Sequence, residues 1–205
     1  MALALIALVT LAAVLPLPAA PHSAGMVGQT RGGCVCHNQT ESFSVTPSID
    51  GLPGNWEPGE EYLLNLTYEG GPARGPSARA GFDLKVSAGE LVGTTGPLTV
   101  RVDPGSGEAT HTKEGSNVSS WHILWRTPNE GTGVVTFTLV VNAVNGDGVQ
   151  GPGDQWGQLE KEVAEGDPGG LGKASTFWIV VGITAMLAIA ALAWYATRGP
   201  RVERR

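Results

Sequence analysis

The sequence predicts an all-β protein, a two-sheet sandwich of about seven strands with an apolar helical segment at each end of the chain. Short runs that alternate apolar and polar residues have the two-residue period of half-buried strands. The 30 glycines and 14 prolines are scattered between these runs, as turn residues are in a chain of many short strands. About 150 residues remain between the apolar ends, which is the size of one domain with a sizeable core.

Residues 1–24 are predicted to be a secretory signal peptide that begins as a helix. An apolar run over residues 1–15 is followed by Pro, Ala, Ser and Gly, the composition of a cleavage region. Small residues place the cut after Ala19 or Ala24, since a cut after Ala20 would leave a proline directly behind it. The alternative is an uncleaved anchor, for which the run is short of the roughly 20 residues that a membrane span needs.

The sandwich itself is expected over residues 41–164, followed by a flexible stalk at 165–175 that is rich in glycine. Turn residues bound each alternating run. Short strands at this spacing predict an immunoglobulin-like pair of sheets. The strands are predicted at residues 43–46, 61–68, 79–86, 98–102, 121–126, 134–142 and 158–163. The side chains predicted to face the core are Tyr62, Leu64, Leu66, Tyr68, Ala80, Phe82, Leu84, Val86, Trp121, Ile123, Trp125, Phe137, Leu139 and Val141.

The second apolar segment, residues 176–197, is predicted to be a transmembrane helix. It carries no charged residue, and at about 1.5 Å per residue it is long enough to cross a bilayer. Trp178 and Trp194 near its two ends suit the membrane interfaces, and the basic tail at 198–205 favours the cytoplasm. We therefore expect a single-pass protein of the cell membrane, with an extracytoplasmic N-terminal domain and a cytoplasmic C-terminus.

The region outside the two apolar segments is acidic. Between residues 25 and 173, nine lysines and arginines stand against eighteen aspartates and glutamates, a net charge of about −9. This balance argues against nucleic acid as a partner and is typical of a soluble exposed domain.

Two cysteines and a histidine form the most informative motif of the chain. Cys34, Cys36 and His37 lie in a predicted N-terminal loop at residues 25–40, which we expect to be exposed. In the haem c attachment signal Cys-x-x-Cys-His, the two cysteines form thioether bonds to the haem and the adjacent histidine binds the iron. Here the spacing between the two cysteines is one residue shorter. The motif thus predicts a haem site of unusual spacing.

Two other fates are open to these thiols in an exported protein. One is a copper or zinc site that takes a fourth ligand from His111 or His122. The other is a disulfide between Cys34 and Cys36.

A glycine-rich loop near the end of the predicted sandwich offers hard oxygen ligands. Asn145, Asp147 and Asp154 could hold calcium, although turn chemistry explains the same residues. Glycosylation sequons begin at Asn38, Asn65 and Asn117.

The order of the motifs resembles the reeler-like, choice-of-anchor V family. The residues that carry the resemblance are Cys34–His37, Trp56–Tyr62, Arg79–Leu84, His111–Thr112, Trp121–Pro128, Gly131–Phe137 and Asn142–Gly148. The resemblance implies a surface protein with an immunoglobulin-like sandwich and a C-terminal anchor. Members usually carry Cys-x-x-Cys-His, so Cys34, Cys36 and His37 map onto that signal with one residue missing between the two cysteines.

Within this resemblance His111 is a candidate for the axial ligand opposite His37, which would give a bis-histidine haem and an electron-transfer protein. The alternative is that His111 is exposed on a strand or loop. His122 alternates with apolar neighbours and is expected to face solvent.

Two classes of function therefore remain, and no catalytic motif favours an enzyme. The first is a membrane-anchored surface module that binds an unknown protein. The second is a membrane-anchored electron-transfer protein that uses Cys34, Cys36, His37 and His111 to hold haem c and meets a redox partner.

Overall fold

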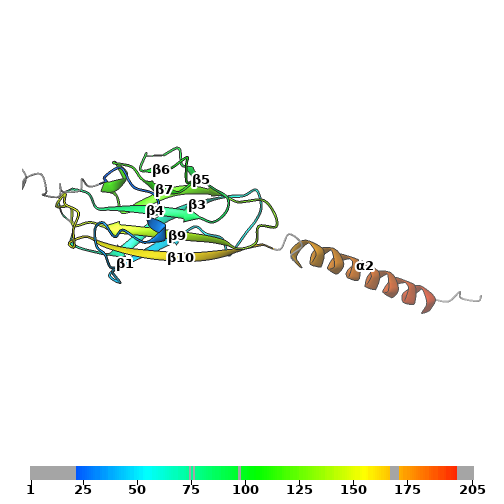
Figure 1. Ribbon diagram of the computed structural model, residues 1–205. Coiled ribbons are helices and arrows are strands. Elements are labelled where there is room, and N and C mark those ends of the chain that lie inside the picture. Colours follow the sequence, from blue (N-terminus) through cyan, green and yellow to red (C-terminus); the bar gives the residue numbers. More distant parts are fainter. Residues whose placement is uncertain (1–21, 74, 76, 97, 167–170, 198–205) are drawn as a thin grey trace, which may run out of the picture. The chain divides into compact units, whose positions relative to one another are not determined.

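A computed structural model of the chain describes residues 22–73, 75, 77–96, 98–166 and 171–197 (Figure 1). The predicted signal peptide up to residue 21 and the basic tail lie outside the described residues. The chain divides into two units, residues 1–165 and 166–205.

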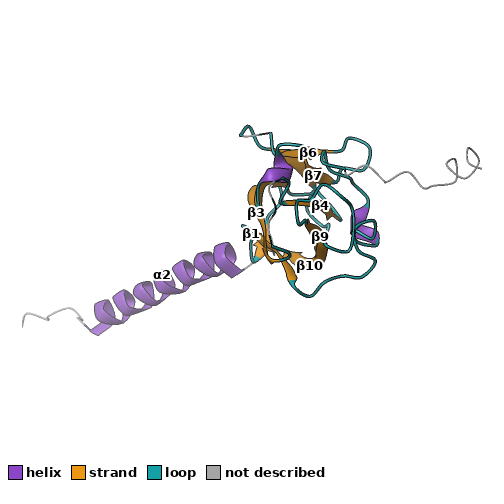
Figure 2. Ribbon diagram, turned by 90° about the vertical axis from the view of Figure 1, so that its left-hand side faces the viewer, coloured by secondary structure: helices purple, strands orange, loops and turns teal. Residues whose placement is uncertain are grey.

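The first unit is a sandwich of two β-sheets, as predicted (Figure 2). Neighbouring strands are antiparallel, except for β2 and β10, which pair in parallel. The four-stranded sheet has the order β1 (Val45–Asp50), β3 (Glu61–Gly70), β8 (Ser120–Arg126) and β5 (Glu90–Gly93). The six-stranded sheet has the order β2 (Asn55–Trp56), β10 (Gln155–Glu165), β9 (Val135–Ala143), β4 (Ala80–Val86), β7 (Ala109–His111) and β6 (Val100–Val102).

Every predicted strand overlaps a strand of the structure, but the described residues form ten strands rather than seven. The additional strands are β2, β5 and β7, which span two, four and three residues. Runs this short do not complete enough alternations for a period of two to be recognised. Two short 3₁₀ helices, η1 (Gln29–Arg31) and η2 (Gly115–Asn117), lie outside the sheets.

The core between the sheets is aromatic. Trp125 on β8 is fully buried and packs edge-on against Phe137 of β9, with ring centroids 4.8 Å apart. It also stacks on Tyr62, 5.8 Å away, and meets the ring of Trp56 edge-on at 6.4 Å. The side chains predicted to face inward all lie in this core or pack against it, so the alternation of residues predicted the buried face of each strand correctly.

Strand β4 is buried on both faces, which the sequence did not predict. Ala80, Phe82 and Leu84 face the core, while Gly81 and Asp83 point to the opposite face and are buried as well. The cover comes from the N-terminal segment, here defined as residues 22–38. Its helix η1 lies against β4 and β9 on the side away from β1 and β3 (Figure 2).

The N-terminal segment is therefore not the exposed loop that we expected. Thr30 is buried within it, and Gly33 packs on the ring of Trp156 from β10. The indole N–H of Trp156 also donates a hydrogen bond of 2.7 Å to the carbonyl oxygen of Asn38.

The second unit holds the helix α2 (Leu171–Thr197), which confirms the predicted apolar helix and starts five residues before the predicted boundary at 176. Its stretch Trp178–Tyr195 has a mean hydropathy of 2.0 and no part of it is buried. The helix is long and apolar enough to cross a membrane.

Candidate functional site: a cavity lined by histidine and cysteine

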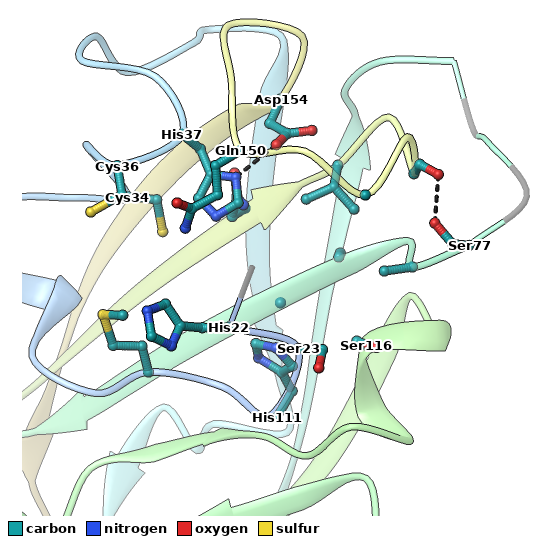
Figure 3. A pocket seen from close by; sticks show the side chains of 18 of the residues that line it. His22, Ser23, Cys34, Cys36, His37, Ser77, His111, Ser116, Gln150 and Asp154 are labelled. Carbon is teal, nitrogen blue, oxygen red and sulfur yellow. Dashed lines mark hydrogen bonds and ion pairs between the residues drawn. The ribbon is translucent and has the colours of Figure 1, made fainter. Parts of the chain in front are cut away.

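A cavity of about 330 Å³ lies between the N-terminal segment and the outer face of β4 and β9 (Figure 3). The loop between β9 and β10, residues 144–154, closes a further side. Three of the chain's four histidines line the cavity, together with both cysteines and one methionine. These residues are His22, Met26, Cys34, Cys36, His37 and His111. The fourth histidine, His122, lies on β8 in the other sheet and is exposed, as predicted.

Cys34 and His37 belong to one helical turn. The amide N–H groups of His37 and Asn38 both donate to the carbonyl oxygen of Cys34, at 3.0 and 3.4 Å. Residues three apart in such a turn share a face, whereas residues two apart do not. Cys34 and His37 therefore face the same side, and the sulfur atoms of Cys34 and Cys36 point in different directions (Figure 3).

The two cysteines also differ in environment. Both are free thiols; Cys36 is exposed and Cys34 is largely covered. Burial raises the pKa of the Cys34 thiol to about 12, and the charges of Asp83 and Cys36 raise it further in the same direction. Cys34 is therefore a protonated thiol at neutral pH, with little nucleophilic character.

His37 is oriented by a buried carboxylate. Its Nδ1 lies 2.7 Å from Oδ2 of Asp154, whose side chain is only 2% exposed. The other oxygen of Asp154 accepts a hydrogen bond of 3.0 Å from the backbone N–H of Asn145. Because a carboxylate only accepts, the proton of this contact belongs to Nδ1 of His37, and in the neutral ring Nε2 is the atom with a free lone pair.

His111 has the opposite arrangement. Its Nδ1 accepts a hydrogen bond of 3.1 Å from the backbone N–H of Phe82, so the proton of the neutral ring belongs to Nε2. The ring is 9% exposed and lies so close over Gly81 that a Cβ atom there would overlap it. Burial lowers the pKa of His111 to about 4; the hydrogen bond to the Phe82 backbone opposes this and the charge of Arg101 adds to it.

His111 is therefore neutral at neutral pH and offers the cavity an N–H donor rather than a lone pair. It is not exposed, so that alternative of the sequence analysis is wrong. As an axial ligand, His111 would have to bind iron through the nitrogen that holds the proton, which makes it a weaker candidate than His37.

The residues predicted to bind calcium stabilise a turn. The carboxylate of Asp147 accepts hydrogen bonds from the Val149 backbone and the Asn145 side chain, at 2.8 and 2.9 Å. These bonds, the Val149 one first, lower the pKa of Asp147. Asp154 is engaged by His37 and the Asn145 backbone. Among the described residues, no three or more His, Cys, Asp or Glu side chains converge as a metal site would require.

Two buried oxygens that line the cavity have no hydrogen-bond partner. They are Oδ1 of Asp83 on β4 and Oδ1 of Asn142 on β9. Buried polar atoms are nearly always satisfied, so a water molecule or a ligand that donates hydrogen bonds is expected to meet them. No sequence signal pointed to either residue, because alternation placed both on the face that was expected to be in solvent.

Gly33 permits the close approach of the N-terminal segment to β10. Its φ is 78°, a conformation that favours glycine, and a Cβ atom would overlap the ring of Trp156. We expect Gly33→Ala to lower the free energy of unfolding by roughly 1–3 kcal/mol, through backbone strain and overlap with the indole. Thermal unfolding of the full-length protein, followed by circular dichroism, measures the change.

The adjacent glycine is the matched control. Gly32 has a φ of −151°, and a Cβ atom added to it would meet no other atom within 4 Å, so Gly32→Ala should leave the melting temperature almost unchanged. Equal effects of the two substitutions would show that the packing on Trp156 does not hold the segment.

Comparisons with known proteins give similarity of structure only. No protein-family model matches the chain, and no curated protein matches its sequence. The Reelin-N domain of F-spondin is 18% identical, with 62% of this chain and 89% of that chain covered and a TM-score of 0.43. The human F-spondin reeler domain is 18% identical over 62% of this chain and 91% of its own, with a TM-score of 0.41. A cohesin module from Clostridium perfringens is 14% identical, with 60% of this chain and 98% of that chain covered and a TM-score of 0.38. These values are too low to assign the chain to any of these families.

Proposed function

We propose that the sandwich is an extracytoplasmic haem-binding module that carries electrons, and that α2 anchors it in the membrane. The observation that carries the proposal is the gathering of Cys34, Cys36 and His37 with His22 and Met26 around one cavity. These residues come from the two ends of the N-terminal segment, and Figure 3 places His22 across the cavity from His37. A lone imidazole is common in proteins, but thiols, imidazoles and a thioether around one cavity are the donor types that hold a haem.

The residues present fit a haem in chemistry, and the cavity would hold part of one. Imidazole and thioether side chains are usual axial ligands of haem iron, and thiols attach its vinyl groups. The cavity volume of about 330 Å³ is at the lower end of the roughly 300–1,000 Å³ typical of small-ligand sites, so part of a macrocycle would lie in solvent. Phe82, Val144 and Val149 supply apolar lining for its faces.

In this proposal His37 binds the iron through Nε2, and Asp154 holds the ring in the tautomer that leaves this atom free. His22 or Met26, which line the same cavity, would supply a second ligand. When bound, the haem supplies a one-electron couple between its ferric and ferrous forms. The predicted cut of the signal peptide after Ala19 retains His22, whereas the cut after Ala24 would remove it.

Cys34 is the proposed attachment point, because it shares a face with His37 in the helical turn. Its S–H would supply the sulfur of a thioether bond to a haem vinyl group, with the thiol proton going to the other vinyl carbon. This addition would need no oxidant. Cys36, which is exposed and faces elsewhere, is left free.

The test is an absorption spectrum and a pyridine haemochrome assay on the full-length protein extracted from its native membrane. We expect covalent haem in the unmodified protein, loss of the covalent signal in Cys34→Ala, and its retention in the matched variant Cys36→Ala. Loss of the covalent signal in Cys36→Ala alone would support the haem site but overturn the choice of Cys34 as the attachment point. No haem in the unmodified protein would overturn the proposal and leave a surface module that binds another protein.

A further inference from the structure

Two buried carboxyl groups hold the N-terminal segment against the six-stranded sheet. Asp83 on β4 is 1% exposed, and Glu108, directly before β7, is 5% exposed. Oδ2 of Asp83 accepts hydrogen bonds from the backbone N–H groups of Gln29 and Thr30, at 2.7 and 3.3 Å. Oε2 of Glu108 accepts one of 2.6 Å from the backbone N–H of Gly28.

These contacts satisfy the start of η1. The first N–H groups of a helical turn have no partner within the turn, and here both carboxyl groups fill that role. The hydroxyl of Thr30 adds a long hydrogen bond of 3.4 Å to Oε1 of Glu108. The docking of this stretch therefore depends on two acidic groups that have been removed from water.

Nothing described in the structure neutralises the pair. Arg101 on β6 directs its guanidinium to the carbonyl oxygens of Ala24 and Gly25, at 3.1 Å each. The remaining oxygen of Asp83, Oδ1, is buried without a partner. The other titratable or charged residues on elements packed around Asp83 are Lys85 on its own strand, His111 on β7, and His22, Arg31, Cys34, Cys36 and His37 on the N-terminal segment.

Two adjacent buried carboxylates without a cation are costly, because each charge is desolvated and repels the other. Burial is the main reason that the pKa of Asp83 is raised to about 7, and the charge of Glu108 adds to it. The backbone hydrogen bonds from Gln29, Thr30 and Gly28 lower the pKa of Asp83 and offset only part of this rise.

We propose that Asp83, which lies beside Glu108, binds a proton as a latch, and that loss of this proton releases the N-terminal segment and opens the cavity. The segment carries Cys34 and His37, so its release removes one wall of the cavity. This latch goes beyond the proposed function, because it operates whether or not haem is bound.

The direction of the pH dependence follows from linkage. A carboxyl group whose pKa is raised in the docked state favours docking while it is protonated, and this contribution is lost as the pH rises through about 7. Above that pH, the equilibrium between docked and released segment should shift toward release by up to about tenfold per pH unit.

Hydrogen exchange of the full-length protein in detergent micelles, read by mass spectrometry, tests the latch. The protection of peptides covering residues 22–33 is measured at pH 6 and at pH 8.5 and corrected for the intrinsic exchange rate at each pH. We expect this protection to be at least about tenfold lower at pH 8.5 than at pH 6, while peptides from β9 keep their protection. In Asp83→Asn, which removes the charge and keeps an acceptor oxygen, the protection of residues 22–33 should be the same at both values.

The control is Asp50→Asn, which changes an exposed carboxylate at the end of β1 and should behave as the unmodified protein does. A fall in β9 protection in any variant would reveal general unfolding rather than release of the segment. Protection of residues 22–33 that does not change with pH in the unmodified protein, or that falls equally in Asp83→Asn, would overturn the latch.

Discussion

Alanine in place of His37 is expected to shift the haem absorption bands of the membrane-extracted protein while leaving the sandwich folded. The imidazole is the proposed iron ligand, and its ring is held by the hydrogen bond of 2.7 Å to Asp154. Loss of that bond leaves a buried carboxylate with one partner fewer, at a cost of about 1–3 kcal/mol. Absorption spectroscopy reads the haem, and circular dichroism reads the fold.

Two further variants separate the role of the ligand from that of its support. Asp154→Asn keeps a group that can accept the hydrogen bond but removes the charge, and we expect a smaller shift of the haem absorption bands than in His37→Ala. His122→Ala removes an exposed imidazole from β8 and should change nothing. An unchanged haem spectrum in His37→Ala would contradict the assignment of His37 as the ligand.

Alanine in place of Trp125 is expected to lower the free energy of unfolding by about 3–5 kcal/mol. The side chain is fully buried and packs against Trp56, Tyr62 and Phe137 between the two sheets. Its indole N–H also donates to the carbonyl oxygen of Ala88 at 3.1 Å, so truncation leaves both a cavity and an unpaired acceptor. Chemical denaturation followed by circular dichroism measures the loss.

Leu63→Ala is the matched control for this substitution. Leu63 lies on the neighbouring strand β3 and is 54% exposed, so its truncation should cost well under about 1 kcal/mol. A small effect of Trp125→Ala would show that the surrounding rings close the cavity, and that the core does not depend on this tryptophan.

The sequence was sufficient to predict which side of each long strand faces the core. In β3 and β8 the apolar side chains recur at every second residue, and hydrophobic burial acts on each such residue separately. The pattern says nothing about what covers the opposite side. Asp83 therefore looked like a solvent-facing residue of an amphipathic strand, although the N-terminal segment buries it.

The candidate site was predicted in part, and for a similar reason. Cys34, Cys36 and His37 were recognised because they are adjacent in sequence. Asp154 is 117 residues away from its partner His37, and its place in a glycine-rich loop indicated calcium rather than a hydrogen bond. Contacts at such separations depend on strand pairing, which residue composition does not encode locally.

Strand β10 connects the cavity to the point where the chain leaves the sandwich. The strand begins at Gln155, next to the loop that holds Asp154, and ends at Glu165. Its eleven residues span about 36 Å, so the cavity and the exit of the chain are at opposite ends of one strand. A pull on the chain beyond Glu165 would have to break the nine residue pairs between β10 and β9 before it displaced Asp154 and, with it, His37.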